Sequence, residues 1–307
     1  MHDLVSVCIP TYNGAEYLED CLRSVISQTY SNIEILVIDE GSSDSTIDII
    51  KSYLDQDSRV RLIINDQRLG LVPNWNKCLK EARGEWIKFQ FQDDLMDTDC
   101  IQKMYNVGRM HNTNLVLSDR EYKCADIERQ KFFNGIETLA KALEKDEVLI
   151  TPARVAEIMM SNGLKHNFMG EPIVGLINRT VFDKYGVFDE RYRQIVDFEY
   201  WLRVALNEPV SFVHQKLNMF RIHQDSVSSQ NLNTNGPNPT YTDRVLLILD
   251  ILESPFFKNI RDMLGKSGLQ SLRPLLKYYV KKVGFWRAII NVDSRVLRYY
   301  RWRDLLL

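Results

Sequence analysis

The chain has 307 residues, of which 45% are hydrophobic and 26% charged, so it is long enough to bury a substantial core. Its formal net charge of −2 argues against any general attraction to nucleic acid. No apolar run approaches the ~20 residues of a membrane-spanning helix, and the start of the chain lacks the form of a signal peptide. The five cysteines are scattered without a CxxC pair, which predicts reduced thiols in a cytoplasmic protein.

The first part of the chain alternates between apolar runs and segments with helical spacing. We expect strands at residues 4–9, 33–38, 60–64 and 86–91, and helices at 17–26, 46–54 and 74–82. Gly84 is the expected C-cap of the third helix. Such alternation predicts βαβ units and a mostly parallel sheet flanked by helices.

Polar loops follow the predicted strands, and right-handed crossovers would bring these loops to one edge of the sheet. Asp93 and Asp94 come directly after the apolar run of Trp86 to Phe91. A Mg²⁺-like cation that holds a diphosphate would suit the two carboxylates, and the alternative is a polar turn that closes the strand. The sequence contains neither GxGxxG nor GxxxxGK[ST], so we expect a metal ion to neutralise any bound phosphate.

The later part of the chain is less regular. Residues 115–118 and 210–213 look like strands, the second at a sheet edge, and residues 121–130 look like a loop. A helix is expected at residues 196–206, with Asp197 in its first turn, where Asp is also a common N-cap. A lone histidine such as His223 is more often structural than a ligand. The Asn-, Gly- and Pro-rich residues 229–239 predict a disordered loop or a lid.

From residue 241 onward the pattern is helical. Residues 272–307 contain nine basic and two acidic side chains, a difference of +7, with aromatic side chains between them. Such helices can lie on an anionic membrane surface, or they can form a docked subdomain with a solvated basic face.

Four stretches taken together resemble the inverting family 2 glycosyltransferases, which use nucleotide sugars and have the GT-A fold. They read VSVCIPTYNGAEYLEDCLRSVISQTYSNIEILVIDEGSSDST, NDQRLGLVPNWNKCLKEARGEWIKFQFQDDLM, GVFDERYRQIVDFEYWLRVA and FRIHQDSVS. The resemblance implies a GT-A domain over residues 1–235. It leaves residues 236–307 as a helical C-terminal extension.

The resemblance also implies roles for individual residues. Asp94 would bind the metal, Mn²⁺ or Mg²⁺, and His223 could complete that site. Asp197 aligns with the catalytic base, although Val196 stands where the family usually has Glu, and Glu199 is the alternative base. The first acid of the family's metal-binding motif is replaced by Gln92. The residues expected to contact the nucleotide sugar are Pro10, Thr11, Tyr12, Asn13, Asp39, Arg68, Asn76, Gln92 and Asp93.

The expected activity is therefore metal-dependent, hexosyltransferase-like transfer of a sugar with inversion. The donor would be a nucleotide-diphosphate sugar, in the first place a UDP-sugar. The acceptor would be a hydroxyl of a glycan or lipid-linked glycan, in surface polysaccharide biosynthesis, with peripheral membrane contact through the C-terminal helices. The alternatives are a non-catalytic nucleotide-sugar-binding scaffold of the same fold and a nucleotidyltransferase.

Overall fold

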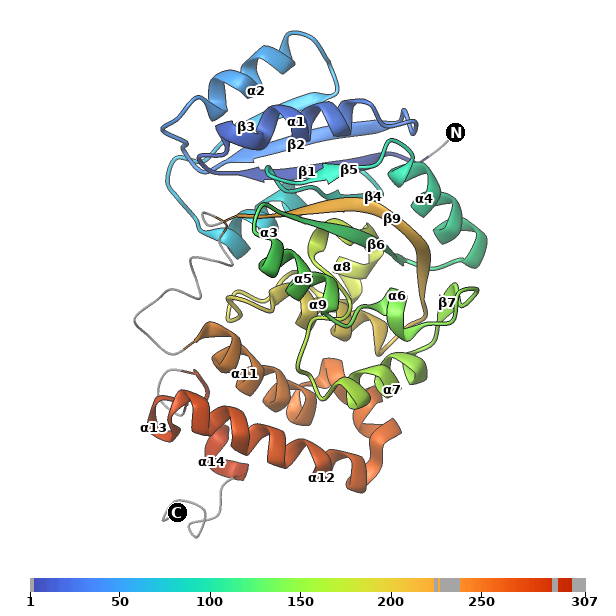
Figure 1. The fold of residues 1–307 in the computed structure, drawn as a ribbon, viewed down its shortest axis with the longest axis vertical. Coiled ribbons are helices and arrows are strands. Elements are labelled where there is room, and N and C mark those ends of the chain that lie inside the picture. Colours follow the sequence, from blue (N-terminus) through green and yellow to red (C-terminus); the bar gives the residue numbers. More distant parts are fainter. Residues whose placement is uncertain (1–2, 224–225, 227–237, 289–291, 300–307) are drawn as a thin grey trace. The chain divides into compact units, whose positions relative to one another are not determined.

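The computed structural model describes residues 3–223, 226, 238–288 and 292–299 (Figure 1). The chain divides into two compact units. The first contains Met1–Ile150, Asn167–Phe188 and Pro209–Ile222, and the second contains Thr151–His166, Asp189–Glu208 and His223–Leu307. The expected boundary between residues 235 and 236 lies outside the described residues. The second unit also includes the helix that carries Asp197. The sequence predicts that this helix belongs to the first domain.

The first unit is built on one mixed sheet. Its strands, as far as the structure describes the chain, run in the order β3-β2-β1-β4-β8-β6-β9-β5, and β7 pairs with β9. Strands β3, β2, β1 and β4 are parallel to one another, and β8 is antiparallel to both of its neighbours. The strand bounds are β1 Val5–Thr11, β2 Ile33–Asp39, β3 Val60–Ile64, β4 Trp86–Phe89, β5 Leu95–Met96, β6 Leu115–Cys124, β7 Leu149–Ile150, β8 Gly175–Asn178 and β9 Val210–Ile222.

Helices cover both faces of the parallel strands. Side chains of α1 (Ala15–Ile26), α2 (Thr46–Leu54) and α4 (Cys100–His111) share one buried cluster with alternate residues of β1 and β2, such as Val7 and Val37. Helix α3 (Leu71–Glu81) contacts the opposite face, where the Cys8 thiol meets the Cys78 carbonyl. The remaining helical segments of this unit are α5 (Ile127–Gly135), α6 (Leu139–Ala142), the 3₁₀ turn Pro172–Val174 and α8 (Arg179–Tyr185).

The expected strands and helices of the N-terminal part are confirmed, but the role expected for Gly84 is wrong. Helix α3 ends at an extended Ala82, and the φ of Gly84 is not positive. Glycine is required at position 84 because a Cβ there would lie 2.6 Å from the main-chain nitrogen of Ser6. Close approach of two backbones, not a left-handed turn, therefore selects this glycine.

Two expectations for the later part are also wrong. Residues 121–130 are not a loop, because β6 runs on to Cys124 and α5 begins at Ile127. Strand β9 does not stop at Val213 and is not an edge strand, because it continues to Ile222 between β6 on one side and β5 and β7 on the other. Both differences arise because β6 pairs with β9 along most of its length. Local sequence contains little information about such long-range pairing.

The second unit is helical in the part of the chain that is described. No helix in that part is both long and apolar enough to cross a bilayer. Its α-helices are α7 (Pro152–Asn162), α9 (Val196–Ala205), α11 (Pro239–Glu253), α12 (Lys258–Val283), α13 (Phe285–Arg287) and α14 (Val296–Tyr299).

Two buried carboxylates of α11 hold the segment that leads into α9. One oxygen of Asp243 accepts hydrogen bonds from the main-chain N–H groups of Arg193, Gln194 and Ile195, at 2.9, 2.6 and 3.0 Å. Asp250 accepts from the Tyr192 hydroxyl at 2.8 Å and from two arginines. The C-terminal helices thus fix the start of α9, and with it the position of Asp197 within this unit.

We expect Asp243→Ala to lower the free energy of unfolding by about 2 kcal/mol, because it leaves three main-chain donors without their acceptor. Urea unfolding measures this loss. The matched control is Asp262→Ala, which removes an exposed carboxylate of α12 paired with Lys258 and should cost less than about 0.5 kcal/mol. Equal effects of the two substitutions would contradict the anchoring role of Asp243.

Candidate functional site

Asp39 ends β2 beside Thr11, the last residue of β1, at the carboxyl edge of the parallel strands. The side chain is fully buried. Its carboxylate accepts hydrogen bonds from the Thr11 hydroxyl at 2.8 Å, from the Ser42 hydroxyl at 2.6 Å and from the Ser42 N–H at 2.7 Å. A carboxylate has about four acceptor positions, and these contacts use three of them.

Polar side chains hold the loop after β1. The Gln92 side chain accepts from the main-chain N–H of Tyr12 at 2.9 Å and donates to the Tyr12 carbonyl at 3.2 Å. A Cβ on Gly14 would lie 2.2 Å from Oε1 of Gln92, so glycine at this position leaves room for the Gln92 amide. The Asn13 side chain accepts from the Ser43 N–H at 2.8 Å. Gln92 and Asn13 thus shape the loop, and Pro10 precedes it within β1.

The loop after β3 carries Arg68 next to Tyr12. The guanidinium carbon of Arg68 lies 4.0 Å from the centroid of the Tyr12 ring, a cation–π contact, and most of the Arg68 side chain is exposed. Glu40 anchors this loop, because its Oε1 accepts from the N–H groups of Leu69 and Gly70 at 2.8 and 2.7 Å. The exposed Arg68 and the half-buried Tyr12 therefore form a cation–π pair at the carboxyl edge of the sheet.

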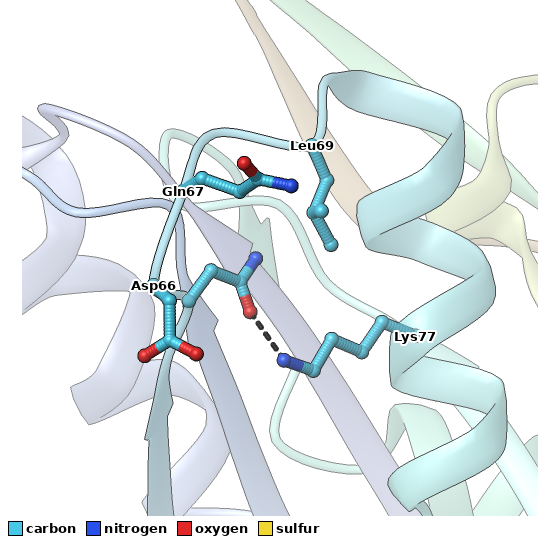
Figure 2. A pocket seen from close by; sticks show the side chains of 5 residues that line it. Asp66, Gln67, Leu69 and Lys77 are labelled. Carbon is cyan, nitrogen blue, oxygen red and sulfur yellow. Dashed lines mark hydrogen bonds between the residues drawn. The ribbon is translucent and has the colours of Figure 1, made fainter.

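A hollow of about 320 Å³ lies between the loop after β3 and helix α3 (Figure 2). Its lining includes Gln67 and Leu69 from the loop and Lys77 from α3, and Lys77 donates to the side chain of Asn65 at 2.7 Å. Asn76, the preceding residue of α3, is expected to contact a ligand. In the structure its amide instead bonds to both main-chain groups of Phe188, at 3.0 and 3.1 Å.

Asp94 lies in the turn between β4 and β5 and is fully buried. Its Oδ1 accepts from the main-chain N–H of Arg221 in β9, at 2.8 Å. Its Oδ2 is buried and has no hydrogen-bond partner among the residues that the structure describes. The Arg221 side chain closes this turn, because its Nε donates to the Asp93 carbonyl at 2.9 Å and its guanidinium carbon lies 4.5 Å from the centroid of the Tyr17 ring.

Burial raises the pKa of Asp94 well above its usual range, and the adjacent Asp93 carboxylate raises it further, while Arg221 opposes the shift. A carboxylate with a buried oxygen that nothing satisfies fits a cation, since hard cations prefer carboxylate oxygens and would remove the cost of burying the charge. The buried carboxylate of Asp94, with Asp93 beside it, therefore has the chemistry that suits Mg²⁺ or Mn²⁺.

Asp197 and Glu199 lie in the first turn of α9, in the second unit. Oδ1 of Asp197 accepts from the N–H of Phe198 at 2.8 Å. Glu199 is buried, and both of its oxygens pair with Arg203 one turn later, at 2.9 and 2.5 Å. Its pKa is raised because burial outweighs the charge of Arg203. The pairing occupies both oxygens of Glu199, and Asp197 remains the candidate base.

His223 is the first residue of the last segment of the second unit. Its carbonyl accepts from the Ser226 hydroxyl at 3.0 Å. Within the described part of the chain, no three side chains of His, Cys, Asp or Glu gather into a metal-binding group. The candidate metal ligands therefore belong to different units: Asp93 and Asp94 to the first and His223 to the second.

The residues Tyr12, Asp39 and Arg68 lie in or beside the loops at the carboxyl edge of β1, β2 and β3, and the Asn76 amide bonds to the main chain of Phe188. The sequence reasoning missed three supporting residues: Glu40, Arg221 and Asp243. Glu40 could have been found, since it follows Asp39 directly at a strand end. Arg221 and Asp243 act on segments more than 45 residues away in the chain, and no local pattern marks them.

Comparisons with known proteins agree with this geometry. Residues 6–150 match the family model described as "Glycosyl transferase family 2". An uncharacterized protein of Mycobacterium tuberculosis, MT1568, is 32% identical over 251 residues, which cover 81% of this chain and 77% of that protein.

Two solved structures share the fold. TarS 1–349 of S. aureus in complex with UDP-GlcNAc superposes with a TM-score of 0.64 at 18% identity, over 97% of this chain and 84% of the other. The mannosyltransferase PcManGT of Pyrobaculum calidifontis, in complex with GDP-Man and Mn²⁺, has a TM-score of 0.59 at 16% identity, over 100% and 78% of the two chains. The sheet order, the carboxyl-edge loops and these matches lead to one conclusion: the chain belongs to glycosyl transferase family 2 and has the GT-A fold.

Proposed function

We propose that this protein transfers a sugar from a nucleotide-diphosphate sugar, in the first place a UDP-sugar, to an acceptor hydroxyl with inversion at the anomeric carbon. The observation that carries the proposal is Asp94, a buried carboxylate beside Asp93 with one unsatisfied oxygen, at the edge of the sheet where α/β proteins bind ligands. Two structural neighbours were solved with a nucleotide sugar bound, and one of these complexes also contains Mn²⁺.

The donor would lie along the carboxyl edge of β1, β2 and β4. The pair of Arg68, which is exposed, and Tyr12, which is half-buried, offers a surface for a nucleobase, and the remaining acceptor position of Asp39 suits a base N–H. Arg221 adds a positive charge beside the Asp93 and Asp94 turn, where the diphosphate would lie. Among the described residues, the side-chain hydrogen bond of Arg221 uses Nε, and its guanidinium also packs on the Tyr17 ring.

Asp93 and Asp94 would hold Mn²⁺ or Mg²⁺. A divalent cation bound there supplies Lewis-acid stabilisation of the negative charge that develops on the diphosphate. Asp197 would accept the proton of the acceptor hydroxyl as its oxygen forms a bond to the anomeric carbon and the bond to the diphosphate breaks. Attack from the face opposite the diphosphate gives inversion. The acceptor we propose is a hydroxyl of a glycan or lipid-linked glycan.

The experiment that tests this function combines a binding screen with a transfer assay. Thermal unfolding is followed with UDP-, GDP- and dTDP-sugars, each with and without Mn²⁺, because a ligand that binds only the folded state raises the unfolding temperature. Release of the nucleoside diphosphate together with a glycosylated acceptor supports the enzyme. Binding without transfer or hydrolysis of any bound donor would support a non-catalytic scaffold instead.

We expect Asp94→Asn to abolish the gain in UDP affinity that Mn²⁺ gives, because an amide is a far weaker ligand than a carboxylate. Without metal, the same variant should unfold at or above the wild-type temperature at neutral pH. The raised pKa of Asp94 means that its charged form destabilises the folded state, and stability falls as the pH rises above the ordinary Asp range. Calorimetric titration with Mn²⁺ and with EDTA, and thermal unfolding, measure the two effects. A Mn²⁺ effect that survives the substitution would contradict the assignment.

We expect Asp197→Asn to reduce kcat by at least about 10²-fold, the usual contribution of a general base. UDP affinity should change less than twofold, since the candidate nucleotide-binding residues lie elsewhere in the chain. Steady-state kinetics and calorimetry separate the two quantities. The matched control is Asp189→Asn, another carboxylate of the same unit that pairs with Arg191. Turnover of Asp197→Asn equal to that of the control would exclude Asp197 as the base.

We expect Arg221→Ala to weaken metal-free UDP binding about tenfold, the effect of losing one charge-assisted hydrogen bond, and to leave uridine binding unchanged. The main-chain N–H that binds Asp94 survives the substitution, so the variant tests the side chain alone. Titrations in EDTA with UDP and with uridine measure the difference. Arg23→Ala, on the exposed face of α1, is the control. Equal losses for UDP and uridine would assign Arg221 a purely structural role.

A further inference from the structure

The last part of helix α12 has one buried side and one exposed side. After a break at Gly265, where φ is +59°, the helix continues to Val283. Its buried side packs against α11, the other long helix of the second unit. The buried side chains are Leu272, Leu276, Tyr279, Val280 and Val283.

The exposed side is basic. Arg273, Lys277 and Lys281 follow one another at four-residue intervals, so they lie on the same side of the helix, and Lys282 lies next to them. All four side chains belong to exposed residues. Residues 263–292 contain six basic residues and no Asp or Glu. We call the exposed side chains of Arg273, Lys277, Tyr278, Lys281 and Lys282 the α12 basic face.

Among the described residues, ion pairs do not account for the charges of Arg273, Lys281 and Lys282. In the described ranges, the ion pair within α12 joins Lys258 and Asp262 at the other end of the helix, and Arg273, Lys281 and Lys282 take part in none. A row of like charges on one helix side is unfavourable on its own. The absence of compensating acids over 30 residues therefore indicates an anionic surface outside the molecule.

The exposed Tyr278 side chain favours a lipid surface over other anionic surfaces. Its side chain is 51% exposed in the middle of the basic face, and its ring packs edge-on against Tyr279, with 5.1 Å between the ring centroids. The Lys282 ammonium lies 5.6 Å from the centroid of the Tyr278 ring. An exposed tyrosine held among lysines suits the boundary between lipid headgroups and acyl chains, where amphipathic rings are favoured.

We propose that the α12 basic face binds the surface of a bilayer that contains anionic phospholipids. Each Lys or Arg near such a surface contributes about 1 kcal/mol, roughly a fivefold gain in partitioning, so Arg273, Lys281 and Lys282 bring a binding gain of about two orders of magnitude. The inference does not depend on the transfer reaction, since it uses side chains of α12 alone. It would place the enzyme on the membrane that carries lipid-linked acceptors.

The test is sedimentation of the full chain with vesicles of phosphatidylcholine alone and with vesicles that also contain one quarter phosphatidylglycerol. The wild type should bind only the anionic vesicles, and less strongly as the salt concentration rises. The quadruple variant Arg273→Gln, Lys277→Gln, Lys281→Gln, Lys282→Gln should lose at least about 100-fold in partitioning. Tyr278→Ala should lose severalfold, and Tyr278→Trp should retain binding.

The matched control neutralises four exposed lysines of the first unit: Lys51, Lys80, Lys123 and Lys216. It should bind anionic vesicles within a few fold of the wild type. Thermal unfolding of both quadruple variants, with unchanged midpoints, shows that the substitutions act on the surface alone. Equal binding to neutral vesicles, an equal loss in the control, or binding to heparin or DNA but not to vesicles would each overturn the proposal.

Discussion

A buried carboxylate with one unsatisfied oxygen is the constraint on which the site depends. Asp94 is fully buried in the turn after β4, its Oδ1 is held by the main chain of Arg221, and its Oδ2 has no partner in the described structure. Such an arrangement costs folding free energy in the empty protein, because burial and Asp93 both oppose the charge. A cation bound by Asp94 and a diphosphate would remove that cost. Binding of the metal and the donor would therefore stabilise the folded state.

The arrangement of the sheet explains why the site lies where it does. Strands β3, β2, β1 and β4 are parallel, so the loops after them share one edge, and each loop is stabilised from a neighbouring segment. Gln92 holds the loop after β1, and Glu40 holds the loop after β3. In the second unit, Asp243 of α11 holds the start of α9. The C-terminal helices therefore support the segment that carries the proposed base, in addition to forming the α12 basic face.

Local sequence was sufficient to predict the parallel half of the fold, because apolar runs and helical spacing are local signals. It also predicted the placement of Thr11, Tyr12, Asp39 and Arg68 at one edge. It failed where distant pairing decides the outcome, as in the extension of β6 and β9. Arg221 and Asp243 were missed for the same reason, since each acts on a segment far away in the chain.

The central claim is that Asp94 binds the cation that holds the donor diphosphate. The most direct measurement is a crystal structure with UDP and Mn²⁺, in which anomalous scattering locates the manganese. The account predicts one manganese about 2 Å from Oδ2 of Asp94 and in contact with phosphate oxygens of UDP. A manganese bound to UDP but remote from Asp94, with Oδ2 still unpartnered, would contradict it.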